Sequence, residues 1–141
     1  MKMTKEEPFD WKEFYELGDS YIEDENPATQ RTGISRFYYS AFCSSRDLIN
    51  EKAAYLNTTS KRIMTGEKRG NVHQETRKIF NEHPRYKNDK KCRMISRNLN
   101  KLRKMRNEAD YDKITTKPLP QMLENSKSRS KYILELLEEF S

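Results

Sequence analysis

The stretch RTGISRFYYSAF, residues 31–42, decides the fold because it alternates small side chains with large aromatic ones. It lies within a longer segment, 28–52, in which core-forming residues recur at helical spacing. The residues that share this face are Ile34, Tyr38, Ala41, Phe42, Ser45, Leu48 and Ile49. Small side chains let a second helix approach closely, and the aromatic rings fill the space around it. The segment therefore predicts a tightly packed central helix.

Two adjacent tyrosines in this stretch, Tyr38 and Tyr39, point about 100° apart on a helix. One ring can therefore pack inward while the other lies nearer the edge of the core. Two interpretations follow. In the first, both tyrosines are structural and their hydroxyls are hydrogen-bonded in the core. In the second, Tyr39 and the neighbouring Arg36 belong to a site that binds nucleic acid or a nucleotide.

Four further segments show helical periodicity: residues 9–24, 71–83, about 88–112 and about 119–140. Between residues 53 and 70 the periodicity is lost and two glycines occur, which predicts a loop. No segment shows the sustained alternation of a strand that is rich in β-branched residues. We expect a single domain over residues 1–141, with its core at about 9–140. The expected fold is all-α, an up-and-down bundle of four to five helices.

Several classes of protein are excluded by the composition. No run of 18 apolar residues occurs, and the acidic first 30 residues lack the pattern of a signal peptide. Cys43 and Cys92 cannot form a disulfide framework, so we expect a cytoplasmic protein with reduced, buried thiols. His73 and His83 are not spaced as metal ligands, and GEKRG, residues 66–70, is too short for a Walker loop. We therefore expect no metal, no cofactor and no membrane contact.

The net charge of +6 is unevenly distributed. Residues 1–26 hold nine acidic and three basic side chains, whereas residues 85–106 hold ten basic side chains and one acidic one. Such a basic stretch, which includes Arg103 and Arg106, attracts polyanions, with RNA or DNA first among them. The alternative is a solvated helix face whose charge complements the acidic N-terminal segment of the same or a neighbouring chain.

The end of the basic segment, LRKMRNEADYD at residues 102–112, combines several polar groups. Arg106 and Asp110 are four residues apart and face the same side of a helix, as do Asn107 and Tyr111. An ordinary intrahelical salt bridge would explain the first pair and contributes only a few tenths of a kcal/mol. The functional interpretation is a site in which the planar guanidinium of Arg106 holds a phosphate.

Together, RTGISRFYYSAFCSSRDL, GNVHQETRKIF and LRKMRNEADYD resemble segments of the HEPN family (higher eukaryotes and prokaryotes nucleotide-binding domains). The resemblance covers about residues 9–140. It implies a helical bundle that dimerises, with the late-helix motifs facing a shared cleft. It also implies a setting, because many members are metal-independent ribonucleases of toxin–antitoxin, phage-defence and CRISPR systems.

The catalytic motif of that family is Arg, four to six residues, then His. Arg106 matches the Arg, which in the family binds phosphate. The His is expected at position 111, 112 or 113, and these positions hold Tyr111, Asp112 and Lys113. Histidine exchanges protons near neutral pH, whereas an unperturbed tyrosine titrates near 10 and is a poor base. The resemblance therefore favours nucleotide binding, with catalysis open.

Three functions remain as hypotheses. The first is a module that binds RNA or a nucleotide in a prokaryotic toxin–antitoxin or defence setting. Its candidate binding residues are Arg36, Tyr39, His73, Arg103, Arg106 and Asn107. Its expected partners are a second copy of the chain and a nucleotidyltransferase-type antitoxin or another defence protein.

The second hypothesis is a metal-independent ribonuclease toxin with an altered active site. Arg106 would hold the scissile phosphate, and Asp110 or Tyr111 would assist proton transfer. The third hypothesis is a noncatalytic helical interaction protein that dimerises or docks through its opposite charges. In that case the pair of Arg106 and Asp110 is structural, and losing it changes stability rather than affinity for nucleic acid.

Overall fold

The computed structural model describes residues 7–51 and 53–140. It contains six α-helices and one short 3₁₀-helix in this part of the chain, and no strand. The elements are α1 (Lys12–Ser20), α2 (Pro27–Glu51), η1 (Ala53–Tyr55), α3 (Thr58–Thr65), α4 (Val72–Glu82), α5 (Lys90–Tyr111) and α6 (Leu119–Glu138). The all-α prediction is confirmed for the described residues.

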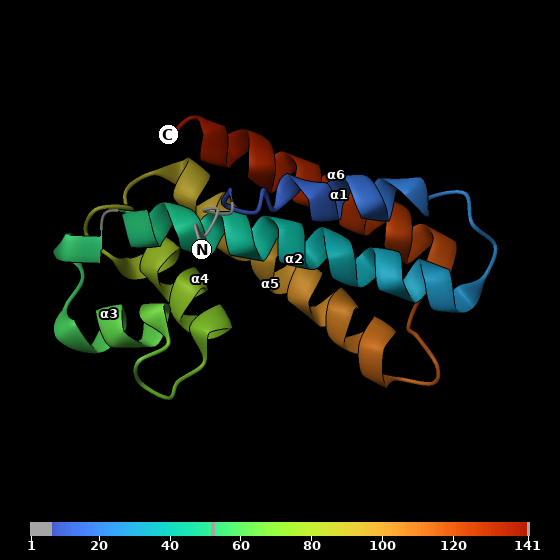
Figure 1. Cartoon of the computed structure of the whole chain (residues 1–141), viewed down its shortest axis with the longest axis horizontal. Coiled ribbons are helices and arrows are strands. Elements are labelled where there is room, and N and C mark those ends of the chain that lie inside the picture. Colours follow the sequence, from blue (N-terminus) through green and yellow to red (C-terminus); the bar gives the residue numbers. More distant parts are fainter. Residues whose placement is uncertain (1–6, 52, 141) are drawn as a thin grey trace, which may run out of the picture.

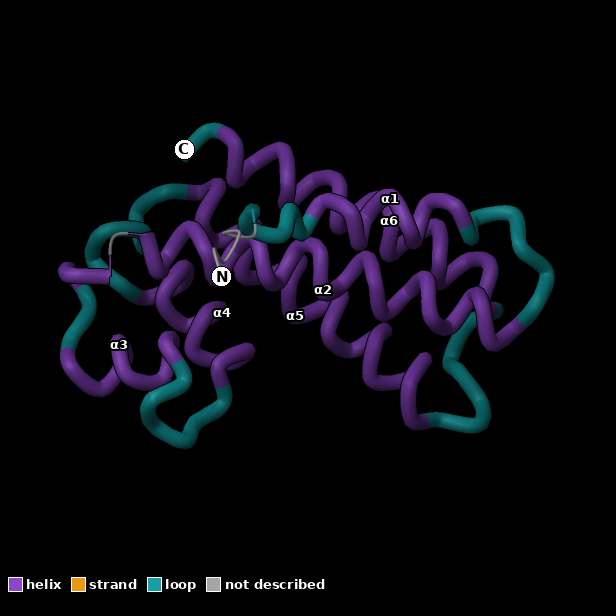
Figure 2. The backbone as a smooth tube through the Cα atoms, in the orientation of Figure 1, coloured by secondary structure: helices purple, strands orange, loops and turns teal. Residues whose placement is uncertain are grey.

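Four of these helices form a bundle in which successive members run in opposite directions, as Figure 1 shows for α1, α2, α5 and α6. Helix α2 is the centre of this bundle and packs against α1, α5 and α6. The two remaining α-helices, α3 and α4, lie at one end, where α4 packs against α5. Loops join all the helices (Figure 2). None of the described helices is both long and apolar enough to cross a bilayer.

The small residues of α1 and α2 allow the close approach that the sequence predicted. A Cβ atom on Gly33 would lie 2.7 Å from Leu123 Cδ1 of α6. A Cβ atom on Gly18 of α1 would lie 3.0 Å from the Phe37 ring. Both distances are too short for a comfortable van der Waals contact. Glycine at these two positions therefore lets α1 and α6 sit directly against α2.

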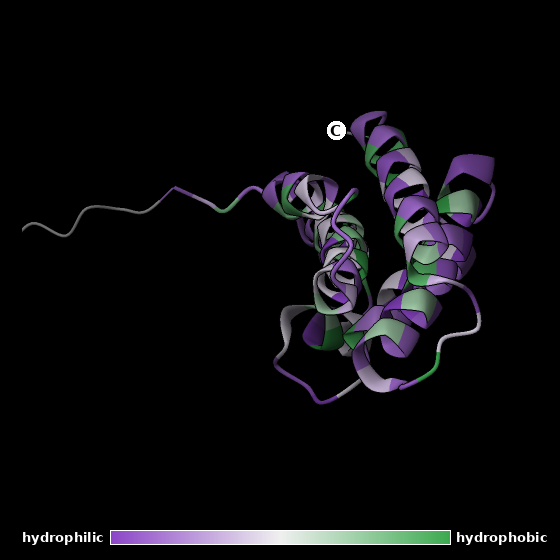
Figure 3. Cartoon of the chain, turned by 90° about the vertical axis from the view of Figure 1, so that its right-hand side faces the viewer, coloured by the Kyte–Doolittle hydropathy of each residue, from purple (hydrophilic) through white to green (hydrophobic). Residues whose placement is uncertain are grey.

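The core is built from aromatic and aliphatic side chains of every α-helix except α1, which is buried mainly through Gly18. Its largest fully buried side chains come from α2, α3, α4, α5 and α6. They are Ile34, Phe37, Tyr38, Ile49, Met64, Phe80, Ile95, Leu99, Leu102, Met122, Leu123 and Ile133. Figure 3 shows hydrophobic positions facing the space between the helices and hydrophilic positions facing outward. Cys92 is fully buried, whereas Cys43 is only partly buried, so the expectation of two buried thiols holds for Cys92 alone.

The predicted loop over residues 53–70 is wrong in part, because η1 and α3 lie within it. Local caps encode α3 rather than a long apolar period. The side chain of Asn57 accepts a hydrogen bond from the Ser60 backbone N–H, which caps the first turn. Gly66 follows the last turn with φ of +83°, a left-handed conformation that ends helices. This adds a sixth helix to the four to five that we expected.

Arg31 of α2 caps the C-terminal end of α5. Its Nη1 donates to the backbone oxygens of Glu108, Ala109 and Asp112 at 3.2, 2.8 and 2.7 Å, and its Nη2 donates to that of Lys113 at 3.2 Å. The last carbonyls of a helix have no partner within the helix, and a cation there is favoured by the helix dipole. One side chain therefore fixes the end of α5 against α2.

Candidate functional site

Five arginine, tyrosine and histidine side chains meet where α2, α4 and α5 come together. We call these five residues the Arg–Tyr–His cluster: Arg36, Tyr38 and Tyr39 of α2, His73 of α4 and Arg106 of α5. The Arg106 guanidinium lies 5.3 Å from the centre of the Tyr38 ring and 5.5 Å from that of Tyr39. The Arg36 guanidinium also lies 5.5 Å from the Tyr39 ring. Cation–π contacts of this kind hold the guanidinium groups over the rings.

His73 packs against two aromatic residues of α2. Its Nδ1 is hydrogen-bonded to the Tyr38 hydroxyl, and its ring stacks on that of Phe42 with the centres 4.1 Å apart. Burial, followed by the positive charge of Arg106, lowers the pKa of His73 to about 4. Because both causes oppose protonation, the imidazole is neutral at pH 7.

The proton of this neutral imidazole can be assigned from its partner. Burial raises the pKa of Tyr38 well above its usual value, so its phenol stays protonated. Nδ1 is the only hydrogen-bond partner of the Tyr38 hydroxyl among the described residues, so the buried phenol O–H donates to it and the imidazole proton lies on Nε2. His73 therefore carries an N–H donor on the nitrogen that Tyr38 does not occupy. This is a group that can bind an anion.

Arg106 is nearly buried, with 9% of its surface exposed, and its charge is poorly compensated. Its predicted pairing with Asp110 is present, but Nη1 and Oδ2 are 3.8 Å apart, which is too long for a hydrogen bond. The Nε atoms of Arg106 and Arg36 are both buried, and neither has a hydrogen-bond partner among the described residues. Buried donors without partners are unfavourable, most of all when they are charged.

Of the residues predicted from the sequence, the structure brings four into the cluster: Arg36, Tyr39, His73 and Arg106. Arg103 lies nearby, because its positive charge contributes to lowering the pKa of His73. Asn107 follows Arg106 by one residue, so its side chain points about 100° away.

Tyr111 does not join the cluster. It is the last residue of α5, it is 75% exposed, and its side chain is rotated about 140° from Arg106 around the helix axis. Sequence reasoning missed Tyr38, a member of the cluster, and Arg77, which lies beside it. Tyr38 was assigned only to the core. Arg77 has a buried Nη1 without a partner, and it could have been found because it follows His73 by one helical turn.

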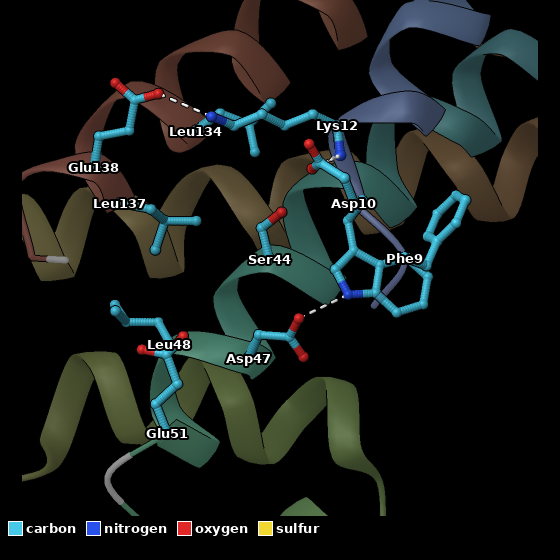
Figure 4. Close-up of a pocket in the computed structure, with 11 residues that line it drawn as sticks. Phe9, Asp10, Lys12, Ser44, Asp47, Leu48, Glu51, Leu134, Leu137 and Glu138 are labelled. Carbon is cyan, nitrogen blue, oxygen red and sulfur yellow. Dashed lines mark hydrogen bonds and ion pairs between the residues drawn. The ribbon is translucent and has the colours of Figure 1, made fainter. Parts of the chain in front are cut away.

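A separate cavity of about 290 Å³ lies where the residues before α1 meet α2 and α6 (Figure 4). Trp11 Nε1 donates to Asp47 Oδ2 at 2.7 Å, and Lys12 pairs with Glu138 at 3.0 Å. Phe9 lies beside Trp11 and is 49% exposed. The cavity contains none of the predicted site residues, and its lining is more acidic than basic. It is therefore distinct from the Arg–Tyr–His cluster.

Comparison of the chain with protein-family models, with curated proteins and with solved structures gives no match.

Proposed function

We propose that this chain binds RNA through the Arg–Tyr–His cluster. The observation that carries the proposal is a pair of neighbouring arginines whose Nε donors are buried without a partner among the described residues. Arg36 and Arg106 each have a buried Nε without a partner, and Asp110 approaches Arg106 only to 3.8 Å. A phosphate would supply the charge and the hydrogen-bond acceptors that these arginines lack.

The aromatic part of the cluster fits the other half of a nucleotide. Tyr39 is partly exposed, and its ring lies beside both guanidinium groups. Proteins that bind single-stranded RNA commonly stack bases on such rings next to arginines that hold the backbone. The Nε2–H of His73 adds a neutral donor for a phosphate or hydroxyl oxygen. Phosphate and base recognition are thus combined at the junction of three helices.

One observation supports the ribonuclease hypothesis: His73 and Arg106 both contact Tyr38 and therefore lie close together. Two properties of His73 oppose it. A base with a pKa of about 4 is weak at pH 7, and its Nε2 already carries a proton. We therefore propose binding as the primary function. The HEPN resemblance, the homodimer and a nucleotidyltransferase or other defence partner remain predictions.

Fluorescence anisotropy with a labelled single-stranded RNA of about 12 nucleotides tests the proposal. Arg106→Gln should weaken binding by about 10- to 100-fold, because a charge-assisted hydrogen bond contributes about 1.5–3 kcal/mol. Arg106→Lys should recover only part of this loss, since it keeps the charge but not the planar fork. Lys131→Gln removes the same charge from an exposed position on α6 and serves as the matched control.

Thermal unfolding of the same variants separates binding from structure. If Arg106→Gln folds, as circular dichroism would show, and binds RNA as tightly as the wild type, the proposal is wrong. If the wild type does not bind RNA while Arg106→Gln lowers the melting temperature, Arg106 is structural. That result would favour the interaction-protein hypothesis.

A further inference from the structure

A second basic surface lies along the contact between α4 and α5. It is a groove of about 450 Å³, which we call the α4–α5 groove. The groove is lined by Arg77 and Asn81 of α4 and by Arg93, Ser96, Arg97 and Asn100 of α5. An adjacent hollow of about 400 Å³ adds Gln74, Lys78 and Glu82. The lining of the groove thus holds three guanidinium groups, two amides and a hydroxyl, with one carboxylate in the neighbouring hollow.

The hydrogen bonds of this groove leave much of its donor capacity unused. Ser96 Oγ donates to the Arg77 carbonyl oxygen at 3.0 Å and ties the two helices together. Arg93 Nη1 donates to the Lys87 carbonyl oxygen at 2.8 Å. Arg77 has a buried Nη1 without a partner among the described residues. Each guanidinium carries five N–H donors, so this surface can donate several hydrogen bonds to oxyanions.

The groove and the Arg–Tyr–His cluster are connected through two helices. On α4, Arg77 follows His73 by four residues, so both lie on one face, about 6 Å apart along the axis. Burial and the charge of Arg103 both lower the pKa of Arg77, so cations crowd this junction. On α5, Arg93, Arg97 and Asn100 recur at helical spacing. Along the α5 axis the rise from Arg93 to Arg106 is about 20 Å, or about six nucleotides of a stacked strand, but the two side chains are rotated by about 140° around the helix. The connection between groove and cluster therefore runs through Arg77 and Arg103, which lie close together at this junction.

We infer that the α4–α5 groove is a second phosphate-binding site, which holds the backbone of the same RNA strand that the cluster binds. The inference rests on the proposed function for the identity of the ligand. It also predicts the path of the RNA strand, which leaves the cluster past Arg77 and follows α5 toward Arg93. Phosphate contacts of this kind position a strand without reading its sequence.

Arg97→Gln tests the groove, because Arg97 is exposed and lies outside the cluster. For an RNA of about 12 nucleotides, losing one phosphate contact should make the slope of log K against log salt less steep by about 0.7. A stacked RNA of about three nucleotides spans about 10 Å, whereas Arg106 and Arg97 are separated by about 13 Å along the axis of α5 and lie on opposite sides of that helix, so this RNA should not contact both. Its affinity should therefore be unchanged in Arg97→Gln and reduced in Arg106→Gln. Lys131→Gln is again the matched control.

A second probe, inorganic tripolyphosphate, separates failure of the groove from failure of the proposed function. In the wild type it should shift the side-chain amide NMR signals of Asn81 and Asn100, and Arg97→Gln should reduce these shifts. If Arg106-dependent RNA binding is found but Arg97→Gln changes neither the salt slope nor the amide shifts, the groove inference is overturned and the proposed function stands. If tripolyphosphate shifts the amides but no RNA binds, RNA is overturned as the ligand of both sites.

Discussion

The Tyr38 hydroxyl of α2 and Nδ1 of His73 of α4 share a hydrogen bond, although the two residues are 35 positions apart in the sequence. This contact places the histidine against the rings of α2 and beside Arg106. It also fixes which imidazole nitrogen carries the proton. The chemical character of the cluster therefore depends on how α4 packs against α2.

The protonation state of His73 can be measured directly. We expect ¹⁵N NMR of the imidazole to show a neutral ring at pH 7 with the proton on Nε2, and a titration midpoint near pH 4. Arg106→Gln removes a positive charge that lowers this pKa, so the midpoint should rise. Lys131→Gln should leave it in place. A midpoint near 6.5 in the wild type would contradict the burial that we describe.

The same shift predicts a dependence of stability on pH. The pKa of His73 is about 4 in the folded chain and about 6.5 in an unfolded one, so between these values the unfolded state binds more protons. The contribution of His73 to stability is thus complete above pH 6.5 and is lost as the pH falls through about 4. The fall in melting temperature from pH 7 to pH 4.5 should be smaller in His73→Gln than in the wild type. Equal falls would refute the linkage.

Replacing Arg31 should loosen the end of α5. Arg31→Gln removes donors to four backbone carbonyl oxygens, and we expect a loss of about 1.5–3 kcal/mol in the free energy of unfolding. Hydrogen exchange should quicken at the amides of residues 108–112 before it does elsewhere in α5. Arg62→Gln, an exposed arginine that lies 3.9 Å from Glu67, is the control and should cost less than about 0.5 kcal/mol.

Adding one methyl group at Gly33 should separate α2 from α6. In Gly33→Ala the new Cβ would lie 2.7 Å from Leu123 Cδ1, and overpacking of this kind costs about 1–3 kcal/mol. Denaturant unfolding measures the loss. Because the clash is with Leu123, the double variant Gly33→Ala/Leu123→Ala should lose less than the sum of the two single variants. Additive losses would show that the clash is not the cause.

RNA incubated with stoichiometric protein in the presence of a chelator should remain intact, since His73 is a weak base and Tyr111 lies outside the cluster. Gel electrophoresis of a labelled RNA pool provides the measurement. Cleavage by the wild type that disappears in Arg106→Gln would establish a metal-independent ribonuclease. His73, Asp110 and Tyr111 would then be the next residues to substitute.

Much of the fold could be predicted because the long helices carry their own signals. Helix α2 was expected at 28–52 and spans Pro27–Glu51, and α5 was expected at about 88–112 and spans Lys90–Tyr111. Their apolar stripes continue over many turns, so a single exception does not hide them. Helix α3 has eight residues and depends on the caps Asn57 and Gly66, so its periodicity is too short to detect.

The candidate site was harder to predict, because only some of its contacts are local. The pair of Arg106 and Asp110 follows from a spacing of four residues on one helix. The bond between Tyr38 and His73 and the contacts of Arg31 with the end of α5 join residues far apart in the sequence. Such contacts depend on which helix faces meet, and side-chain periodicity within one helix does not contain that information.

The hydrogen bonds from Arg31 to the end of α5 also bear on the Arg–Tyr–His cluster. Helix α2 supplies Arg36 and Tyr39, helix α5 supplies Arg106, and Arg31 holds these two helices in one register. For the RNA binding that we propose, this makes the cluster preorganised. Less conformational entropy is lost when a preorganised site binds, so more of the gross contact energy is retained as affinity. No role for Arg31 was predicted from the sequence, yet it thereby raises the affinity of the proposed RNA-binding site without belonging to it.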